Sequence, residues 1–345
     1  MWIASICWIV AGLFYLLIAC NWNSLRVSIA VIETAAEYFA DTKRIIFIPL
    51  IYFAVWVCVF IFWAWGLAGV ASISATGVQY TNIALQLRTA DRTEGTNWMI
   101  AGMFFGMIWI SAFIIAMNEF VIICSSATWY FSRKDIPDAD GIPGDSDVWK
   151  GMWWSFRYNM GSIALGSGIL AIVWTVRAIF EYIGNKMYKA SGNNGCTKCL
   201  VCCISCCLDC FDRFIRYLNR NAYIYMAISG DSFCPSALHS FLLILKNASK
   251  FAFVEGLSDV FMFLAKFFIA ITTTVVGYYL MTPMTKIKID PTLPCVIIFF
   301  FAYFVACKFI GIFDTSANTI LQCYLFDLDL AKHHNLEMRH VPETL

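Results

Sequence analysis

Long apolar stretches, each close to the length of a membrane-spanning helix, are the feature that most limits what this chain can fold into. A helix crosses the hydrocarbon core of a bilayer with about 20 apolar residues. The segment Trp2–Cys20 has nearly this length and contains no charged side chain. It lacks a basic start and a small-residue cleavage site, so we interpret it as a retained helix and not as a signal peptide.

Further apolar segments satisfy the same criterion and predict more spans: Ile45–Ser72, Trp98–Phe131, Tyr158–Ile183, 253–281 and 293–326. The composition agrees, because 60% of the residues are hydrophobic and 14% are charged, against roughly 45–50% and 25% in soluble domains. This excludes a soluble globular enzyme and intrinsic disorder, and the net charge of +1 suggests no nucleic-acid partner. We predict an all-α, polytopic transmembrane helix bundle with six to seven spans, forming a single transmembrane domain over 1–345 in a lipid bilayer.

The seventh span is the uncertain one and lies in residues 221–247. Gly230, Asp231 and Pro235 interrupt the middle of this otherwise apolar segment. A broken helix is tolerated inside a membrane where protein or a water-filled cavity covers the freed backbone groups. The segment therefore predicts either a broken spanning helix or a helix lying in the membrane interface.

Three polar segments complete the predicted organisation: a polar loop at 132–157, a Cys-rich amphipathic segment at 185–220 and a polar C-terminal tail at 327–345. Seven of the fifteen cysteines fall within residues 196–210. Most are three or four residues apart, which places them on one face of a helix. The spacing approaches an iron–sulfur motif but lacks its proline, and it lacks the long spacer of a zinc knuckle. We therefore expect a helix without metal, whose cysteines serve apolar packing or S-acylation.

Small residues at helical spacing predict close contacts between spans. Gly102 and Gly106 form a GxxxG step, and Ala164 and Gly168 form a similar one. Such steps let helix backbones approach each other. Arg177 and Glu181 are four residues apart, which predicts a salt bridge near the end of a span.

Ionisable residues inside apolar segments are the first indication of a site. Charged groups are costly in a membrane and are usually paired or functional. Asp259 and Lys266 lie in the 253–281 span, two helical turns apart and so on one face. Glu119 lies in the 98–131 span. Each carboxylate is expected either to balance a cationic substrate or to form a structural ion pair.

Aromatic side chains are the second indication, since aromatic faces hold quaternary ammonium groups. Trp109 and Tyr223 are the predicted binding residues, and an aromatic belt or lipid-facing packing is the alternative. The sequence contains no Walker motif, GxSxG elbow or HExxH motif. We therefore predict no catalytic residues, no metal and no cofactor, and we expect the protein not to be an enzyme.

A set of distinctive segments runs along the chain. The strongest is RYLNRNAYIYMAISGDSFCPSALHSF (216–241), which follows the Cys-rich run. The others are LRVSIAVIETAAEY (25–38), WIS (109–111), WYFSR (129–133), RYNMGSIALGS (157–167), SDVFMFLAKFF (258–268) and LQCYLFDLD (321–329). In sequence and in order these segments resemble the choline transporter-like family. The resemblance covers essentially the whole chain and corresponds to about the C-terminal half of a family member.

The resemblance implies a multi-pass membrane protein that moves choline or a related amine, in the plasma membrane or, alternatively, a mitochondrial membrane. The chain departs from the family pattern at positions where the family usually has an acidic residue or a histidine: Ala112, Asn318 and Asn159. These departures favour the alternative, a non-transporting structural subunit of a larger membrane protein complex. Asp259, Glu119, Trp109 and Tyr223 are the residues expected to bind an amine substrate if the chain transports one.

Overall fold

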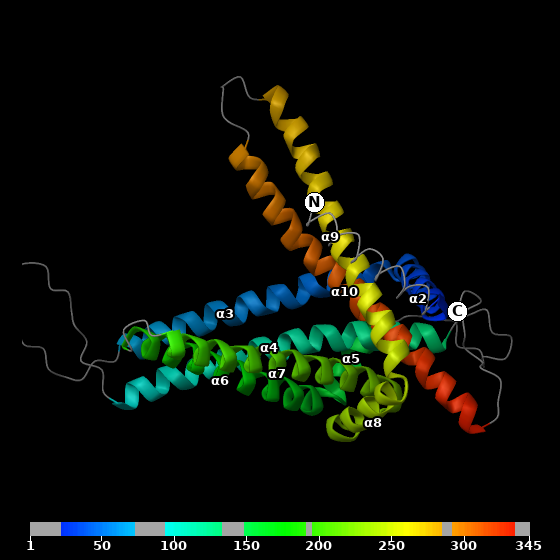
Figure 1. Ribbon diagram of the computed structural model, residues 1–345, viewed down its shortest axis with the longest axis horizontal. Coiled ribbons are helices and arrows are strands. Elements are labelled where there is room, and N and C mark those ends of the chain that lie inside the picture. Colours follow the sequence, from blue (N-terminus) through cyan, green and yellow to red (C-terminus); the bar gives the residue numbers. More distant parts are fainter. Residues whose placement is uncertain (1–21, 73–93, 133–147, 191–194, 285–291, 335–345) are drawn as a thin grey trace, which may run out of the picture. The chain divides into compact units, whose positions relative to one another are not determined.

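The computed structural model describes residues 22–72, 94–132, 148–190, 195–284 and 292–334. All regular structure within these ranges is helical, which confirms the predicted all-α fold (Figure 1). The helices are α2 (Trp22–Asp41), η1 (Lys43–Phe47, a 3-10 helix), α3 (Ile48–Ser72), α4 (Glu94–Phe131), α5 (Val148–Arg157), α6 (Met160–Ala190), α7 (Gly195–Ser229), α8 (Phe233–Lys246), α9 (Ala248–Met284) and α10 (Thr292–His334).

Segments long and apolar enough to cross a membrane coincide with the predicted spans. The described residues contain five: Lys43–Ser72, Glu94–Phe131, Met160–Gly184, Val254–Met281 and Thr292–Lys332. The bent pair of α7 and α8 makes six if it counts as one span. The predicted first span, Trp2–Cys20, lies outside the described residues.

Large apolar side chains cover the outside of these helices. On α3, Phe62 is 72% exposed and Trp65 is 77% exposed. A contiguous apolar surface of this kind is unfavourable in water and marks contact with lipid or another protein. The outward-facing rings thus agree with a membrane-spanning position for α3.

The interruption predicted near residue 230 is confirmed. The α7 helix ends at Ser229, Gly230 has φ +76°, and α8 begins at Phe233 at an angle of 104°. Glycine adopts a positive φ without the clash that a Cβ atom would cause. Pro235 does not break the chain, because it lies in the first turn of α8, where a missing N–H is tolerated.

Two predicted polar segments contain more helix than expected. Residues 148–157 of the predicted loop 132–157 form α5, and residues 327–334 of the predicted tail belong to α10. The α5 sequence is amphipathic, and Gly151 lets it lie close to α4: a Cβ atom added there would be 3.3 Å from Cys124 Cβ. The remaining loop residues, 133–147, lie outside the described part of the chain.

The chain divides into two compact units, both discontinuous in sequence. The first unit comprises Met1–Phe47, Glu119–Trp153 and Ala222–Leu345. The second comprises Ile48–Asn118 and Trp154–Asn221. The single transmembrane domain over 1–345 stays a prediction.

The first unit is built on the pairing of α9 and α10, which lie side by side in Figure 1. A Cβ atom added at Gly277 of α9 would be 3.0 Å from the Ile298 side chain of α10. Phe267 of α9 meets Tyr303 of α10 with ring centroids 5.6 Å apart. The amphipathic helix α2 packs on both α9 and α10.

Indole N–H groups join the helices of the second unit. Trp56 of α3 donates to Ser111 Oγ of α4 at 3.0 Å, and Trp63 donates to the Met103 carbonyl at 2.9 Å. Trp109 of α4 donates to the Ala164 carbonyl of α6 at 3.2 Å. Such bonds satisfy the one polar group of a ring that is otherwise apolar.

The two predicted small-residue contacts differ in outcome. At Gly168 an added Cβ atom would be 3.3 Å from the Trp109 indole, so the Ala164–Gly168 step accommodates a ring. At Gly102 and Gly106, no described atom outside the local helix lies within 4 Å of an added Cβ. Among the described residues, none gives these two positions the predicted close contact, and a GxxxG spacing brings helices together only when a partner helix faces it.

Candidate functional site

A buried polar stretch runs through α10 in the first unit. Every residue from Thr315 to Cys323 is buried, although this stretch lies within a candidate span. Three hydroxyl groups bond back to carbonyls four residues earlier: Thr315 to Gly311 at 3.0 Å, Ser316 to Ile312 at 3.0 Å and Thr319 to Thr315 at 2.7 Å. Polar groups in a span usually face the protein interior or a substrate path, and here they face the interior.

A carboxylate and an aromatic cluster meet in the same unit. Glu119 of α4 is half-buried, and Tyr223 of α7 is only 2% exposed. The Glu119 carboxylate is close enough to the Tyr223 phenol for the two to interact electrostatically. Phe120 meets Tyr223 edge-on with ring centroids 6.4 Å apart, and Phe233 of α8 lies 5.9 Å from Tyr223. We call Glu119, Phe120, Tyr223 and Phe233 the Glu119 cluster.

The Glu119 cluster combines the two features that recognise a quaternary ammonium group. Such a cation has no N–H to donate, so it is held by aromatic faces and by a nearby negative charge. Two of the residues predicted from sequence, Glu119 and Tyr223, are brought together here. Phe120 and Phe233 were not predicted, since nothing in their local sequence separates them from the many other phenylalanines.

The other two predicted residues lie elsewhere. Asp259 is exposed on α9, and Lys266, predicted to share its face, is half-buried. Trp109 belongs to the second unit, where its indole N–H bonds to Ala164 and its ring covers Gly168. The geometry of Trp109 is that of a packing residue.

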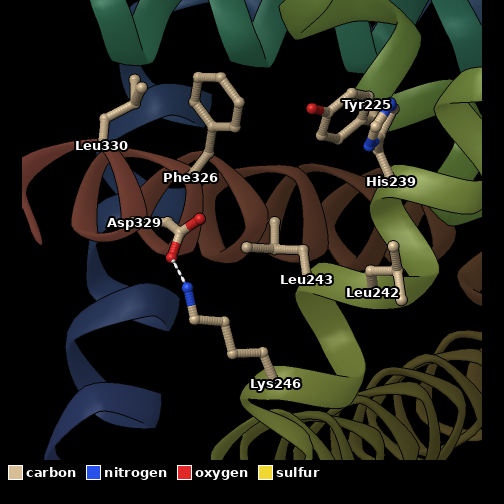
Figure 2. Close-up of a pocket in the computed structure, with 8 residues that line it drawn as sticks. All are labelled: Tyr225, His239, Leu242, Leu243, Lys246, Phe326, Asp329 and Leu330. Atoms are coloured by element: carbon tan, nitrogen blue, oxygen red, sulfur yellow. Dashed lines mark hydrogen bonds and ion pairs between the residues drawn. The ribbon is translucent and has the colours of Figure 1, made fainter. Parts of the chain in front are cut away.

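An open groove lies between the end of α7, α8 and the C-terminal part of α10 (Figure 2). Its volume is about 450 Å³, and Figure 2 shows its lining residues: Tyr225, His239, Leu242, Leu243, Lys246, Phe326, Asp329 and Leu330. The rings of Tyr225 and His239 stack with centroids 5.7 Å apart, and Phe326 meets Tyr225 edge-on. Lys246 and Asp329 form an ion pair between α8 and α10. Sequence reasoning missed this groove, because the residues that α10 contributes are far along the chain from those of the consecutive helices α7 and α8.

The amphipathic helix α2 is fixed to α4 by two polar contacts. The Tyr38 hydroxyl donates to Ser125 Oγ at 2.9 Å, and the Trp129 indole donates to the Asp41 carboxylate at 3.1 Å. Tyr38 is fully buried, and burial raises its pKa from 10.0 to about 12, although the hydrogen bonds to Ser125 and Ser126 lower it in part. This phenol therefore stays neutral over the whole physiological range.

An ionic network joins α6 to α7 in the second unit. The predicted pair of Arg177 and Glu181 is confirmed at 3.0 Å. Arg177 also reaches the carboxylates of Asp209 at 2.7 Å and Asp212 at 3.5 Å. Asp212 is buried, accepts a bond from the Trp174 indole at 2.9 Å and pairs with Arg216. This network joins α6 to α7 through ion pairs and a hydrogen bond.

These features define a class of protein: a multi-pass helical membrane protein with polar groups gathered inside and apolar side chains outside. The family described as "Plasma-membrane choline transporter" matches residues 5–329. The chain therefore belongs to the choline transporter family, which is a family of membrane transporters.

Individual relatives agree with this assignment. Choline transporter-like protein 2 of Dictyostelium discoideum is 30% identical over 328 residues, which cover 93% of this chain and 49% of that protein. Choline transporter-like protein 3 of Bos taurus is 26% identical over 327 residues, covering 93% of this chain and 48% of that protein. Choline transporter-like protein 2 of Xenopus laevis is 32% identical over 232 residues, which cover 65% of this chain and 32% of that protein. The chain thus spans about half the length, or less, of these relatives.

Proposed function

We propose that this protein moves choline or a closely related amine cation across the plasma membrane, and that the Glu119 cluster binds the cation. The observation that carries the proposal is the meeting of one half-buried carboxylate with buried aromatic rings inside a candidate span. A quaternary ammonium over an aromatic face gains roughly 0.5–2 kcal/mol. The carboxylate adds attraction that its own desolvation partly offsets. Weak to moderate affinity suits a carrier that must release its cargo.

Family membership supports both the substrate class and the membrane, since the family description names choline and the plasma membrane. The buried polar stretch of α10 supports a polar interior in the same unit. In this proposal Glu119 balances the positive charge and Tyr223 offers its ring. The proposed site leaves out Asp259 and Trp109, which the sequence also singles out, because Asp259 is exposed and Trp109 is engaged in packing.

The test is uptake of radiolabelled choline into vesicles reconstituted with the purified chain. Glu119→Gln removes the charge and keeps the shape, and we expect uptake to fall at least about tenfold, the factor that 1.4 kcal/mol represents. Tyr223→Leu removes the aromatic face and should also reduce uptake. Asp259→Asn is the matched control, because it makes the same carboxylate-to-amide change on an exposed face of α9.

Two outcomes contradict the proposal in different ways. If Asp259→Asn abolishes uptake while Glu119→Gln transports normally, transport stands but the site is wrong. If the wild-type chain takes up no choline at millimolar concentration, the transport proposal fails.

The second function that we consider is a structural subunit of a larger membrane protein complex. Its support is that Ala112 and Asn318 are both buried at positions where the family resemblance leads us to expect an acidic residue. Replacing an interior carboxylate by a neutral group removes a potential cation-binding charge. Purification in mild detergent separates the two functions, because a structural subunit should elute with a large complex and a carrier should elute alone.

A further inference from the structure

The helix α7 turns one carboxylate, Asp212, inward and its thiols outward. The Asp212 side chain is 2% exposed and interacts with Trp174, Arg177 and Arg216 within the second unit. The opposite side of α7 carries cysteines, and all those that the structure describes there are exposed: Cys199, Cys202, Cys203, Cys206, Cys207 and Cys210. We call these six residues the cysteine stripe.

The cysteine stripe continues into exposed aromatic residues. Its members are three or four residues apart, or adjacent, so they line one side of a helix over about 16 Å. Phe211 is 50% exposed and Phe214 is 47% exposed at its end. A helix face in contact with water would carry charged groups and would turn its cysteines and phenylalanines inward. The exposed cation Arg213 stands at the end of this side, so the arrangement indicates a face that lies against lipid at the headgroup level, where a long basic side chain can reach the interface.

Two other uses of clustered thiols fit this geometry poorly. Side chains at i and i+3 or i+4 on a helix have Cβ atoms about 5–6 Å apart, whereas a disulfide needs about 3.5–4.5 Å. Within the described ranges, no group of three or more His, Cys, Asp or Glu side chains is arranged to hold a metal ion. A thiol on an amphipathic helix beside lipid is instead a typical acceptor of a fatty acyl chain.

We propose that the cysteine stripe of α7 is a site of S-acylation by long-chain fatty acids. The thiolate Sγ attacks the carbonyl carbon of a long-chain acyl-coenzyme A, and a new carbon–sulfur bond forms. The carbon–sulfur bond to coenzyme A breaks, and the proton that leaves the cysteine thiol is balanced by the proton taken up by the coenzyme A thiol. The step transfers an acyl group without oxidation or reduction. The attached chains lie along the apolar side of α7 and fix this amphipathic helix to the bilayer.

The experiment counts thioester-linked cysteines in the full chain expressed in eukaryotic cells. Free thiols are blocked with N-ethylmaleimide, thioesters are cleaved with neutral hydroxylamine, and the released thiols are coupled to a maleimide-polyethylene glycol tag. We expect several hydroxylamine-dependent gel shifts per chain. A variant with all six cysteines of the stripe changed to Ser should lose these shifts. A control variant with Cys124→Ser and Cys323→Ser should keep them, because both thiols are buried.

A second measurement does not depend on how the variants fold. Mass spectrometry of wild-type peptides that cover residues 199–210 should show acyl groups on the cysteines. Complete blocking of the stripe by N-ethylmaleimide before hydroxylamine would overturn the proposal, as would unmodified peptides. If a phosphine reductant reverses the protection of the thiols from N-ethylmaleimide, the cysteines form disulfides. If a chelator reverses it, they bind a metal. Either result also overturns the proposal.

Discussion

At the scale of single residues, Tyr38 shows how burial of a titratable side chain makes the stability of the fold depend on pH. Its hydroxyl bonds to Ser125, and burial raises its pKa to about 12. In the unfolded chain the phenol ionises near its ordinary value of 10.0. Since the folded state holds the proton to higher pH, the stability from this group is complete below pH 10 and is lost as pH rises toward 12.

The variant Tyr38→Phe tests this linkage. At neutral pH it should lower the free energy of unfolding by about 1 kcal/mol, because the buried Ser125 hydroxyl loses its partner. Between pH 10 and pH 12 the free energy of unfolding of the wild type should fall by roughly 2–3 kcal/mol, and that of the variant should not show this fall. Thermal unfolding of both proteins in detergent, measured across this range, checks the prediction. Parallel curves for the two proteins would show that Tyr38 does not cause the decline.

A pair of glycines offers a matched test of packing. Gly168→Leu should overpack the contact with the Trp109 ring and destabilise the second unit by roughly 1–3 kcal/mol. Gly106→Leu should be tolerated better, because no described atom outside the local helix lies within 4 Å of a Cβ atom added there. Melting temperatures of the two variants decide the matter. An equal loss at both positions would mean that Gly106 faces a partner after all.

At the residue scale, the sequence singles out a side chain where its type is unusual for its surroundings. Glu119 stands out in an apolar span, and Tyr223 lies in a specific family motif; the structure brings the two together. Phe326 and His239 gave no such signal, since their meeting at the groove depends on how α8 and α10 pack. Asp259 was equally unusual in sequence but lies on an exposed face, because periodicity identifies a face without saying what covers it.

At the scale of helices, the contact between α6 and α7 depends on charged side chains, since Arg177 of α6 pairs with Asp209 and Asp212 of α7. Asp212 is buried and accepts bonds from Trp174 and Arg216, whereas the Asp209 side chain is 40% exposed and pairs with Arg177. Exposed ion pairs contribute little, because water screens them and side-chain entropy opposes them. Removing the charge of a buried carboxylate costs more, because its cationic partners then lose their counter-charge.

We therefore expect Asp212→Asn to destabilise the protein more than Asp209→Asn. The first change keeps an acceptor for Trp174 but leaves Arg177 and Arg216 without their shared charge, at a cost of roughly 1–3 kcal/mol. The second change should cost less than about 1 kcal/mol. Denaturation of both variants at low and high salt provides the comparison. A larger effect at Asp209, or strong salt dependence at Asp212, would contradict this assignment.

Helices as elements were largely predictable, because a long apolar run allows few alternatives in a membrane. The break at Gly230 was also predictable, since glycine followed by Asp231 is a strong local signal. The α5 helix was not, because its short amphipathic sequence follows a segment rich in Asp and turn residues. Its amphipathic character matters only once α4 is present for Gly151 to approach.

At the scale of the whole molecule, polarity is distributed in the reverse of a soluble protein. Large apolar rings cover the outside of α3, α9 and α10. Hydroxyl and amide groups fill the interior of the first unit, among them Ser125, Ser126, Thr315, Asn318 and Gln322. This distribution follows from the bilayer as solvent, in which an exposed polar group is costly. The assembly of two units from discontinuous segments could not be predicted, because it depends on contacts between residues far apart in sequence.

The proposed choline site makes a further prediction. Choline should stabilise the folded protein through its positive charge. A ligand that binds only the folded state stabilises it by RT ln(1 + [L]/Kd), or about 1.4 kcal/mol at ten times Kd. Choline should therefore raise the melting temperature of the purified protein by roughly 2 °C. The neutral isostere 3,3-dimethyl-1-butanol has the same shape and should give no shift, because it attracts neither the Glu119 carboxylate nor the negative faces of Tyr223 and Phe120.

The variant Glu119→Gln completes this ligand test. It should keep the melting temperature of the unliganded protein within a degree or so and lose most of the choline-dependent rise, because only the attraction between the two charges is removed. Asp259→Asn should keep the full rise, since its carboxylate lies on an exposed face of α9. Differential scanning fluorimetry with a choline titration measures all three proteins under one condition. Equal shifts from choline and its neutral isostere would mean that the protein recognises the shape of the trimethyl group without its charge, and the role proposed for Glu119 would then be wrong.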